Sequence, residues 1–588
     1  MEARARNLLF LYEEGKVIIP FFQRTYVWNR DNWEDLLEEL SNENRSTNFL
    51  GAIILKQIPS ISGEPKQLEV IDGQQRLTTL SILLKAFYDT FPEEIRENCK
   101  GDINGILYYK KDRTSREYDT KIQHSYIDGE AYKKVMIADV NLDLNSINEK
   151  SHKILQCYKF FREKLAGYPV DVRCDLYNKI VNESNKMLVV IDIDQNENEQ
   201  SIFDTLNTTG VRLTVAEIVK NAIFKRAIEL SNRDDTIKLY ENTWQKTFLK
   251  DKETVDYWEA ERTTGRLKRD NIEILLHCIG VIKGFYDPDK HTLSDLSRLY
   301  KEQLAKINSI DELKEFINEI IDYAQIYREK IVTFDKSDAF SFDDSFKRLL
   351  HIMEELEIST FHPLLLNVFK KYQNDAEKIK EILGKIEKFV IRNMLAKIES
   401  VKNYNKLCKQ FINEVSNLDE KLNEIPWDKV ESGLHNISND NALLLLFWIE
   451  LYRLHKDNKY DKKELKYIYS LEHIMPQNWE EYWDFDKVPH PDSSLSPEKQ
   501  KQDREEKIYW IGNMTLLTSS LNSALKNLSF EKKMNGEGQR KGIKAYAALS
   551  ITKDDIVAPF ENGDRVWDEK KIKTRTEKLM EEIREIWG

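Results

Sequence analysis

Three short segments near the C-terminus place the tightest constraint on the fold of this chain. Residues 467–474 are rich in β-branched and aromatic side chains and precede Pro476, so they predict a strand that the proline stops. Residues 508–517 predict a second strand, and residues 519–528 predict a helix with a serine at its N-cap. The predicted order is therefore strand, loop, strand, helix.

Polar side chains in these segments supply the groups that phosphodiester hydrolysis requires. A neutral imidazole, with an ordinary pKa of about 6.5, can take a proton from water near physiological pH, which makes His473 the candidate base. Asn513 is the candidate that orients the imidazole through its other nitrogen. Glu472 and Asn522 would supply oxygen ligands to one Mg²⁺ or Mn²⁺ ion. Since adjacent strand residues face opposite ways, Glu472 and His473 can converge only where the strand ends, which Pro476 favours.

The same segments carry the motifs of a known family. The order of elements, with one histidine and two asparagines, resembles the HNH or His-Me finger (ββα-metal) nuclease fold. Four motifs resemble the C-terminal domain of GmrSD-type modification-dependent (type IV) restriction enzymes: Glu-His-Ile-Met-Pro-Gln at 472–477, Gly-Asn-Met-Thr-Leu-Leu at 512–517, Leu-Asn-Ser at 521–523 and Asn-Leu-Ser-Phe-Glu-Lys-Lys at 527–533. This resemblance gives the candidate residues the same roles. Many HNH enzymes carry Asp in place of Glu472 and Leu in place of Met514, and neither change removes a functional group.

A basic segment follows the candidate nuclease motifs. Between residues 526 and 544 the chain has six Lys or Arg against Glu531 and Glu537, whereas the whole chain has a net charge of −12. An acidic chain cannot bind DNA over its whole surface, so any DNA contact must be local. The candidate DNA contacts are Lys526, Lys532 and Lys533, although each lysine could equally belong to a solvated helix face.

A second constellation lies near the N-terminus. Asp-Gly-Gln-Gln-Arg at 72–76 joins a predicted strand at 68–71 to a helical apolar pattern at 77–87. Free N–H groups and the dipole at a helix start favour an anion, and Gly73 would let a phosphate approach the backbone. The segment therefore predicts an anion site at the start of a helix.

The side chains around this turn suit a nucleotide. Arg76 can hold phosphate oxygens in a fork, Asp72 can hold Mg²⁺, and Gln74 or Gln75 can position a water. Taken alone, the pattern favours an ordinary Asp N-cap with surface glutamines. No Gly-x-x-x-x-Gly-Lys-Ser/Thr sequence occurs, so a Walker-type site is excluded.

Two further motifs change this interpretation. They are Pro-x-x-Gln-Arg-x-Tyr-x-Trp at 20–28 and Asn-Thr-x-Gly at 207–210. With the turn at 72–76 they resemble the ParB-like N-terminal domain of the same restriction family. The resemblance implies nucleotide binding and hydrolysis by Gln23, Arg24, Asp72, Gly73, Gln74, Gln75 and Arg76.

Two residues are further candidate contacts in this region. Gly210 can end one helix, while Thr214 and Glu217 form a capping box for the next, which leaves Asn207 exposed at a sharp junction where its amide could read a ligand. Tyr26 could stack on a base of DNA or nucleotide, or it could belong to the core.

Composition and patterning indicate a cytoplasmic protein of several domains. The five cysteines have neither disulfide-framework nor zinc spacing, and no apolar run of about 18 residues predicts a membrane span. Predicted strands at 49–55 and 187–193 mix with helices in the first part, whereas glycine-poor helical patterns fill the middle. The predicted fold class is α+β, mainly helical. The predicted domains are a ParB-like α/β sensor at 1–230, a helical middle at 231–435 and an HNH nuclease at 436–588.

These observations together predict a nucleotide-dependent DNA endonuclease or nickase of bacterial anti-phage defence, with an associated NTPase activity. The expected partners are modified phage DNA and a nucleoside triphosphate, and a homodimer is left open. One alternative is a ParB-like, nucleotide-switched DNA clamp with a vestigial nuclease domain, which the intact candidate set disfavours. The other is RNA cleavage by a toxin-like enzyme, which a comparison of substrates would test.

Overall fold

The chain forms two compact units in a computed structural model, Met1–Glu241 and Asn242–Gly588. The residues that the structure describes are 2–42, 49–58, 66–110, 118–124, 126–137, 142–193, 214–264, 267–457, 463–525 and 527–588. The predicted helical middle and the predicted nuclease domain lie in one unit, so the three-domain division stays a prediction. The α+β class with mainly helical content is confirmed.

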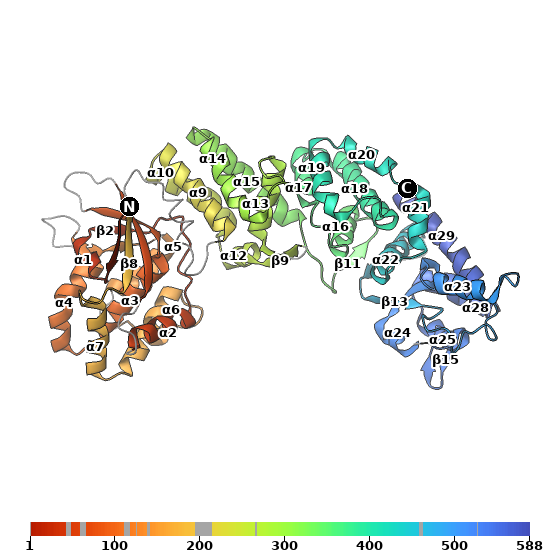
Figure 1. The fold of residues 1–588 in the computed structure, drawn as a ribbon, viewed down its shortest axis with the longest axis horizontal. Coiled ribbons are helices and arrows are strands. Elements are labelled where there is room, and N and C mark those ends of the chain that lie inside the picture. Colours follow the sequence, from red (N-terminus) through yellow and green to blue (C-terminus); the bar gives the residue numbers. More distant parts are fainter. Residues whose placement is uncertain are drawn as a thin grey trace. The chain divides into compact units, whose positions relative to one another are not determined.

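The first unit is built on a mixed six-stranded sheet in the order β1-β8-β3-β4-β2-β7 (Figure 1). The central β3 pairs antiparallel with β4 and parallel with β8, and the predicted strands at 49–55, 68–71 and 187–193 are confirmed as these three. The strands are β1 (Glu2–Arg6), β2 (Lys16–Ile18), β3 (Gly51–Ile58), β4 (Gln67–Asp72), β7 (Ile122–Gln123) and β8 (Leu188–Ile193). A separate hairpin consists of β5 (Tyr108–Lys110) and β6 (Tyr118–Thr120).

Helix α3 (Gln74–Thr90) is the core helix of this unit. Most of its residues are buried, including polar ones such as Thr79, Ser81 and Lys85, which is typical of a helix surrounded by protein. Gly73 is its N-cap with a φ of 89°, a left-handed conformation that favours glycine. The other helices are α1 (Phe10–Glu13), α2 (Arg30–Ser41), α4 (Glu93–Leu107), α5 (Tyr126–Ile137), α6 (Lys153–Ala166), α7 (Val170–Val181), α9 (Val215–Leu230) and α10 (Arg233–Tyr240). The predicted capping box of Thr214 and Glu217 is confirmed at the start of α9.

The second unit begins with a long series of helices. In α15, the predicted apolar stripe lies in the core, with Leu313, Phe316, Ile317 and Ile320 buried. The helices are α11 (Lys246–Phe248), α12 (Lys252–Glu259), α13 (Asn271–Ile282), α14 (Leu296–Ala305), α15 (Ile310–Lys330), α16 (Ser345–Glu355), α17 (His362–Lys371), α18 (Ala376–Ala396), α19 (Tyr404–Asn413), α20 (Ser416–Asn423), α21 (Trp427–Leu434) and α22 (Asn439–Lys456). A hairpin of β9 (Glu261–Thr264) and β10 (Leu267–Asp270), which the helical pattern did not predict, interrupts the series.

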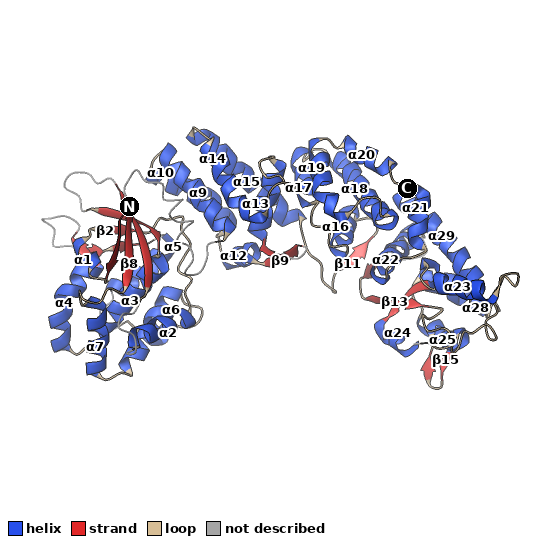
Figure 2. Ribbon diagram, viewed as in Figure 1, coloured by secondary structure: helices blue, strands red, loops and turns tan. Residues whose placement is uncertain are grey.

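The last part of this unit carries the short strands of the candidate nuclease site (Figure 2). Strand β11 (Ala339–Ser341) pairs with β12 (Glu464–Lys466), and β13 (Tyr469–His473) pairs with β14 (Met514–Thr518). A third pair, β15 (Gly536–Glu537) and β16 (Arg540–Lys541), is a small hairpin. The helices here are α23 (Pro497–Lys507), α24 (Ser519–Leu525), α25 (Phe530–Asn535), α26 (Ile543–Tyr546), α27 (Ser550–Thr552), α28 (Ala558–Glu561) and α29 (Glu569–Trp587).

The two predicted strands of the nuclease motif differ in how well they match the structure. The segment predicted at 467–474 is confirmed as β13. The strand predicted at 508–517 is wrong in its first half, because residues 511–513 form a 3₁₀ turn and β14 begins only at Met514. The turn is closed by the backbone N–H of Asn513, which donates to the carbonyl of Trp510 at 2.9 Å.

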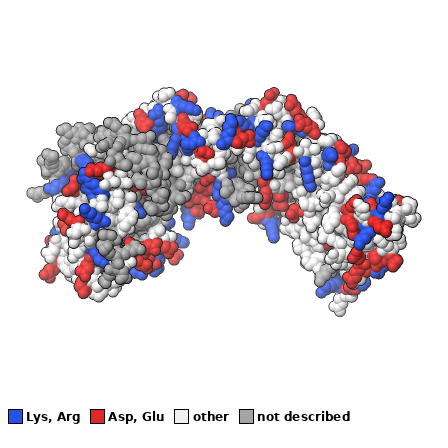
Figure 3. All heavy atoms as spheres, viewed as in Figure 1, with Lys and Arg blue, Asp and Glu red and all other residues white. Residues whose placement is uncertain are grey.

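Charges of both signs are interspersed over the face of the molecule in Figure 3. Since the whole chain has a net charge of −12, a local DNA contact stays a prediction. Within the described part of the chain, no helix combines the length and the apolar character needed to cross a bilayer.

Candidate nuclease site and N-terminal motif cluster

Strand β13 brings Glu472 and His473 to the edge of a small two-stranded sheet. Glu472 lies opposite Thr515 and His473 lies opposite Met514 in the register with β14. The strand ends at His473, which is the condition that the sequence set for the two side chains to serve one site. Within the described structure, no hydrogen bond joins their side chains: Glu472 pairs with Lys533, and Nε2 of His473 has no partner.

The His473 imidazole is in the neutral form that a general base requires. Burial, together with the smaller effect of the nearby Lys533 charge, lowers the pKa of His473 to about 4. The Nε2 atom is buried and has no hydrogen-bond partner within the described structure. An imidazole nitrogen of this kind can accept a proton from a water molecule that enters the site.

Asn513 is fully buried and holds the backbone that follows His473. Its Oδ1 accepts from the N–H of Met475 at 2.9 Å and from Nε1 of Trp567 at 3.2 Å. Its Nδ2 donates to the carbonyls of Met475 at 2.8 Å and Ile508 at 3.0 Å. The expected direct bond from this amide to the imidazole is therefore replaced by bonds to the backbone two residues beyond it.

Asn522 lies on α24 and contacts β13 just before Glu472. Its Nδ2 donates to Oγ of Ser470 at 3.1 Å and to the carbonyl of Leu471 at 2.7 Å. These two bonds fix the amide, and the described residues provide no donor to its Oδ1. The oxygen is thus available as a ligand beside the Glu472 strand.

Lys533 occupies the interior of the site and not its surface. Its Nζ lies 2.5 Å from Oε1 of Glu472 and donates to the carbonyl of His473 at 2.8 Å. The side chain is buried because α25 turns this face, with Phe530 and Met534, towards the core. Burial raises the pKa of Glu472 and lowers the pKa of Lys533, and the ion pair opposes both shifts.

The prediction that Lys533 contacts DNA is therefore wrong for this conformation. Lys532 is exposed but pairs with Glu537 at 2.6 Å, and Lys526 lies outside the described residues. The basic segment has three further exposed members, Arg540, Lys541 and Lys544. Within the described structure, no ion pair involves them.

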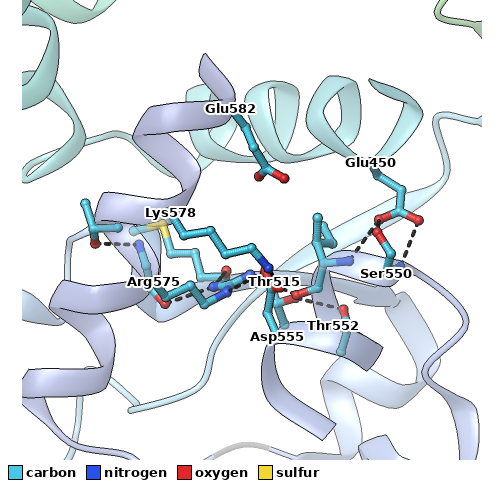
Figure 4. Close-up of polar contacts among 12 residues, drawn as sticks. Glu450, Thr515, Ser550, Thr552, Asp555, Arg575, Lys578 and Glu582 are labelled. Atoms are coloured by element: carbon cyan, nitrogen blue, oxygen red, sulfur yellow. Dashed lines mark hydrogen bonds and ion pairs between the residues drawn. The ribbon is translucent and has the colours of Figure 1, made fainter. Parts of the chain in front are cut away.

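The C-terminal helix α29 supports the turn that carries Asn513, and its Arg575 is labelled in Figure 4. Arg575 is buried and donates through Nη1 to the carbonyls of Gly512 at 2.8 Å and Met514 at 2.6 Å. The N–H of Gly512 donates to Oγ1 of Thr576 at 3.2 Å. Sequence reasoning missed both residues, because they lie about sixty positions beyond the turn and carry no local motif.

A charge network that includes Arg453 holds α29 against α22. Figure 4 shows part of its surroundings, with Arg575 and Lys578 beside Asp555 and with Glu450 bound to Ser550. Asp555 pairs with Arg453 at 2.9 Å and with Arg575, and both arginine–carboxylate contacts are largely buried. On α22, the Glu450 carboxylate accepts from the N–H groups of Ser550 and Ile551 at 2.8 and 2.9 Å, at the start of α27. Burial raises the pKa of Glu450, while these hydrogen bonds oppose the shift. The helix before the motif and the helix after it thus form one scaffold around β14.

In the first unit, the two glutamines of the 72–76 turn hold the loop at 23–28. Gln75 accepts from the N–H of Val27 at 2.8 Å and donates to the carbonyl of Thr25 at 3.0 Å. Gln74 donates to the carbonyl of Arg24 at 3.1 Å. The expectation that these are surface glutamines is wrong for Gln75, which is buried, and both amides already have partners in the neighbouring motif.

The remaining residues of this cluster pack against strands β3 and β4. Arg76 donates to the carbonyl of Ala52 at 2.7 Å, and Gln23 donates to the carbonyl of Val70 at 2.6 Å. A Cβ on Gly73 would lie 2.9 Å from the carbonyl oxygen of Ala52, so the glycine lets β3 approach the turn. Burial lowers the pKa of Arg76, and Asp72 opposes this effect.

The prediction that Tyr26 stacks on a base is wrong for this conformation, because Tyr26 is only 3% exposed. Its hydroxyl contacts Oγ1 of Thr79 at 2.6 Å and accepts from Nε1 of Trp33 at 2.9 Å. Its N–H donates to Asp128 at 2.9 Å. The ring therefore ties the 23–28 loop to the core. Asn207 lies outside the described residues.

Comparisons with known proteins agree with this arrangement of two sites. Residues 6–224 match the family model of the GmrSD restriction endonuclease N-terminal domain, and residues 428–582 match that of the GmrSD restriction endonuclease C-terminal domain. Both models describe domains of restriction endonucleases, which is the class that the chain's two motif clusters define. The chain belongs to the GmrSD restriction endonuclease family.

One curated relative is similar to part of this chain. An uncharacterized protein of Methanocaldococcus jannaschii is 25% identical in an alignment of 261 residues that covers 37% of this chain and 42% of that protein. The chain thus spans less than half the length of this relative.

The approach of α29 to the Asn513 turn gives a stability prediction. In Gly512→Ala, the new Cβ would lie 2.7 Å from the backbone nitrogen of Thr576 and closer still to the carbonyl of Ile572. Such overpacking is expected to lower the free energy of unfolding by about 1–3 kcal/mol. The measurement is urea unfolding of the full chain followed by circular dichroism.

The matched control is Gly384→Ala in α18, where a Cβ would meet no atom within 4 Å. This change is expected to raise stability by up to about 1 kcal/mol, because alanine has the higher helix propensity. Equal effects of the two changes would show that α29 does not constrain the turn.

Proposed function

We propose that this chain is a metal-dependent DNA endonuclease whose cutting site lies at the end of β13. The observation that carries the proposal is the neutral His473 imidazole, whose buried Nε2 has no partner in the described structure and which adjoins a buried carboxylate. Glu472 and the Asn522 amide lie on the same strand segment and its neighbouring helix. A base and two hard oxygen donors are the groups that hydrolysis of a phosphodiester needs.

The donor set suits one divalent cation of the magnesium type. Glu472 offers a carboxylate oxygen and Asn522 an amide oxygen, and Mg²⁺ commonly takes one or two protein oxygens together with water and phosphate. The described residues contain no group of three His, Cys, Asp or Glu side chains that could form a denser metal centre. A bound cation would stabilise negative charge on the scissile phosphate and on the leaving oxygen.

The residues of the site then have separate tasks. Nε2 of His473 takes a proton from the attacking water as the new P–O bond forms and the bond to the leaving oxygen breaks. Asn513 keeps the backbone after the base in place through Met475, and Arg575 keeps the Asn513 turn in place. We place the local DNA contact on the exposed cations Arg540 and Lys541 of the β15–β16 hairpin.

The first unit is the proposed nucleotide-responsive part of the enzyme. The turn at 72–76 opens α3 after a strand, so free N–H groups lie at its start, as the anion site requires. Gln74 and Gln75 connect this turn to the 23–28 loop, so a nucleotide that displaces either amide would also move the loop. The ParB-like resemblance supports hydrolysis of a nucleoside triphosphate here and recognition of a modified phage DNA.

The cutting site is tested with His473→Ala. Cleavage of supercoiled plasmid in Mg²⁺ is expected to fall by about 10²- to 10⁴-fold, because the general base is lost. The control is His455→Ala, which removes a partly exposed histidine paired with Asp343 outside the site. Full activity of the His473 variant would show that the base is assigned wrongly.

The proposed sensor role is tested with a panel of phage DNAs. Unmodified DNA is compared with DNA carrying hydroxymethylated cytosine, glucosylated cytosine or backbone phosphorothioate, with and without each nucleoside triphosphate. We expect cleavage of at least one modified DNA to depend on one nucleotide, because the two motif clusters belong to one enzyme. Identical cleavage of all DNAs under all conditions would contradict the sensor role and leave the nuclease assignment standing.

A further inference from the structure

Lys533 is the cation nearest to the proposed metal ligand, and it lies in the interior of the protein. Its side chain is 1% exposed, and its Nζ contacts two oxygens, Oε1 of Glu472 at 2.5 Å and the carbonyl of His473 at 2.8 Å. A carboxylate oxygen and a backbone carbonyl are also the kinds of atom that bind a hard divalent cation. The Lys533 ammonium therefore already neutralises part of the negative charge of Glu472.

Helix α25 fixes the position of Lys533, so its side chain does not sample the many rotamers of a surface lysine. Its N–H donates to the carbonyl of Ser529 at 2.8 Å, and its helix neighbours Phe530 and Met534 are buried in the core. At the end of α25, Gly536 has a φ of 93° and packs against Gly542, so the backbone cannot easily swing away. The helix therefore holds the Lys533 side chain close to Glu472 in this structure.

Two cations that need the same buried carboxylate must compete. The Glu472–Lys533 pair is neutral as a whole, so a divalent ion adds a double positive charge to a site where the described residues form no group of three His, Cys, Asp or Glu side chains. In a buried environment such an excess is weakly screened and strongly unfavourable. A DNA phosphate in the site would offset part of it.

We propose that Lys533 is the resident counter-ion of Glu472 and makes binding of the catalytic cation depend on the phosphate of bound DNA. The inference rests on the proposed role of Glu472 as a metal ligand. Lys533 is therefore a positioning residue, because it acts on the cation through Glu472. The proposal gives it no contact with the base side chain or with the substrate. The consequence is a nuclease that holds its metal tightly only when DNA is present.

The test measures Mn²⁺ binding by electron paramagnetic resonance on full-length protein in a His473→Ala background, which is expected to slow cleavage by about 10²- to 10⁴-fold. Each protein is titrated with and without a DNA duplex, at mildly alkaline pH. Lys533→Met removes the charge and keeps most of the apolar stem, and Lys533→Arg keeps the charge. The matched control is Lys532→Met, the adjacent exposed lysine that pairs with Glu537.

Without DNA, Lys533→Met is expected to bind Mn²⁺ about tenfold more tightly than the background protein, the usual size of a coupling between sites. Its additional gain on adding DNA is expected to shrink, whereas Lys533→Arg and Lys532→Met should behave like the background protein. Unchanged or weaker Mn²⁺ binding by folded Lys533→Met would overturn the proposal.

Two further results keep the test decisive. If Lys533→Met does not fold, the background protein alone decides, because equal Mn²⁺ affinity with and without DNA would also overturn the proposal. Glu472→Gln in the same background separates the inference from the proposed function. Mn²⁺ binding that survives Glu472→Gln unchanged would show that Glu472 is not a ligand. Loss of Mn²⁺ binding in Glu472→Gln would support Glu472 as a ligand, and the Lys533 variants would then decide whether Lys533 competes with the cation.

Discussion

The nuclease-side site depends on the buried side-chain amide of Asn513. It makes four hydrogen bonds, two of them with the backbone of Met475, and so fixes the chain immediately after His473. Each bond contributes about 1 kcal/mol net, but a buried polar group left without its partner costs about 1–3 kcal/mol. The base can therefore keep one position at the end of β13, where a segment with little regular secondary structure begins.

The first unit uses the same physical device at its own motif. The amide of Gln75 bonds to the backbone of Thr25 and Val27, as that of Asn513 bonds to Met475. In both cases a buried side-chain amide makes the hydrogen bonds that a neighbouring strand would make, and it holds a second motif segment in place. In each unit, motif residues of one segment thus hold the backbone of a second segment. Many of their functional groups position the site and do not contact a ligand.

The sequence predicted those features that depend on local patterns. Strand β13, the helix that carries Asn522 and the capping box at Thr214 follow from residue type and spacing over a few positions. It did not predict that Lys533 is buried, and it left Tyr26 open between a base contact and the core, since the burial of either side chain depends on distant partners. The same holds for Arg575, whose bonds to the Asn513 turn span about sixty residues.

The central claim is that Glu472 and Asn522 hold a divalent cation beside the His473 base. Its most direct test is anomalous scattering from Mn²⁺ in crystals of the His473→Ala protein bound to a DNA duplex. The account predicts one strong peak, with Glu472 and Asn522 oxygens about 2.0–2.2 Å away and a DNA phosphate oxygen completing the site. A peak elsewhere in the chain, with Glu472 still bound only to Lys533 in the DNA complex, would contradict it.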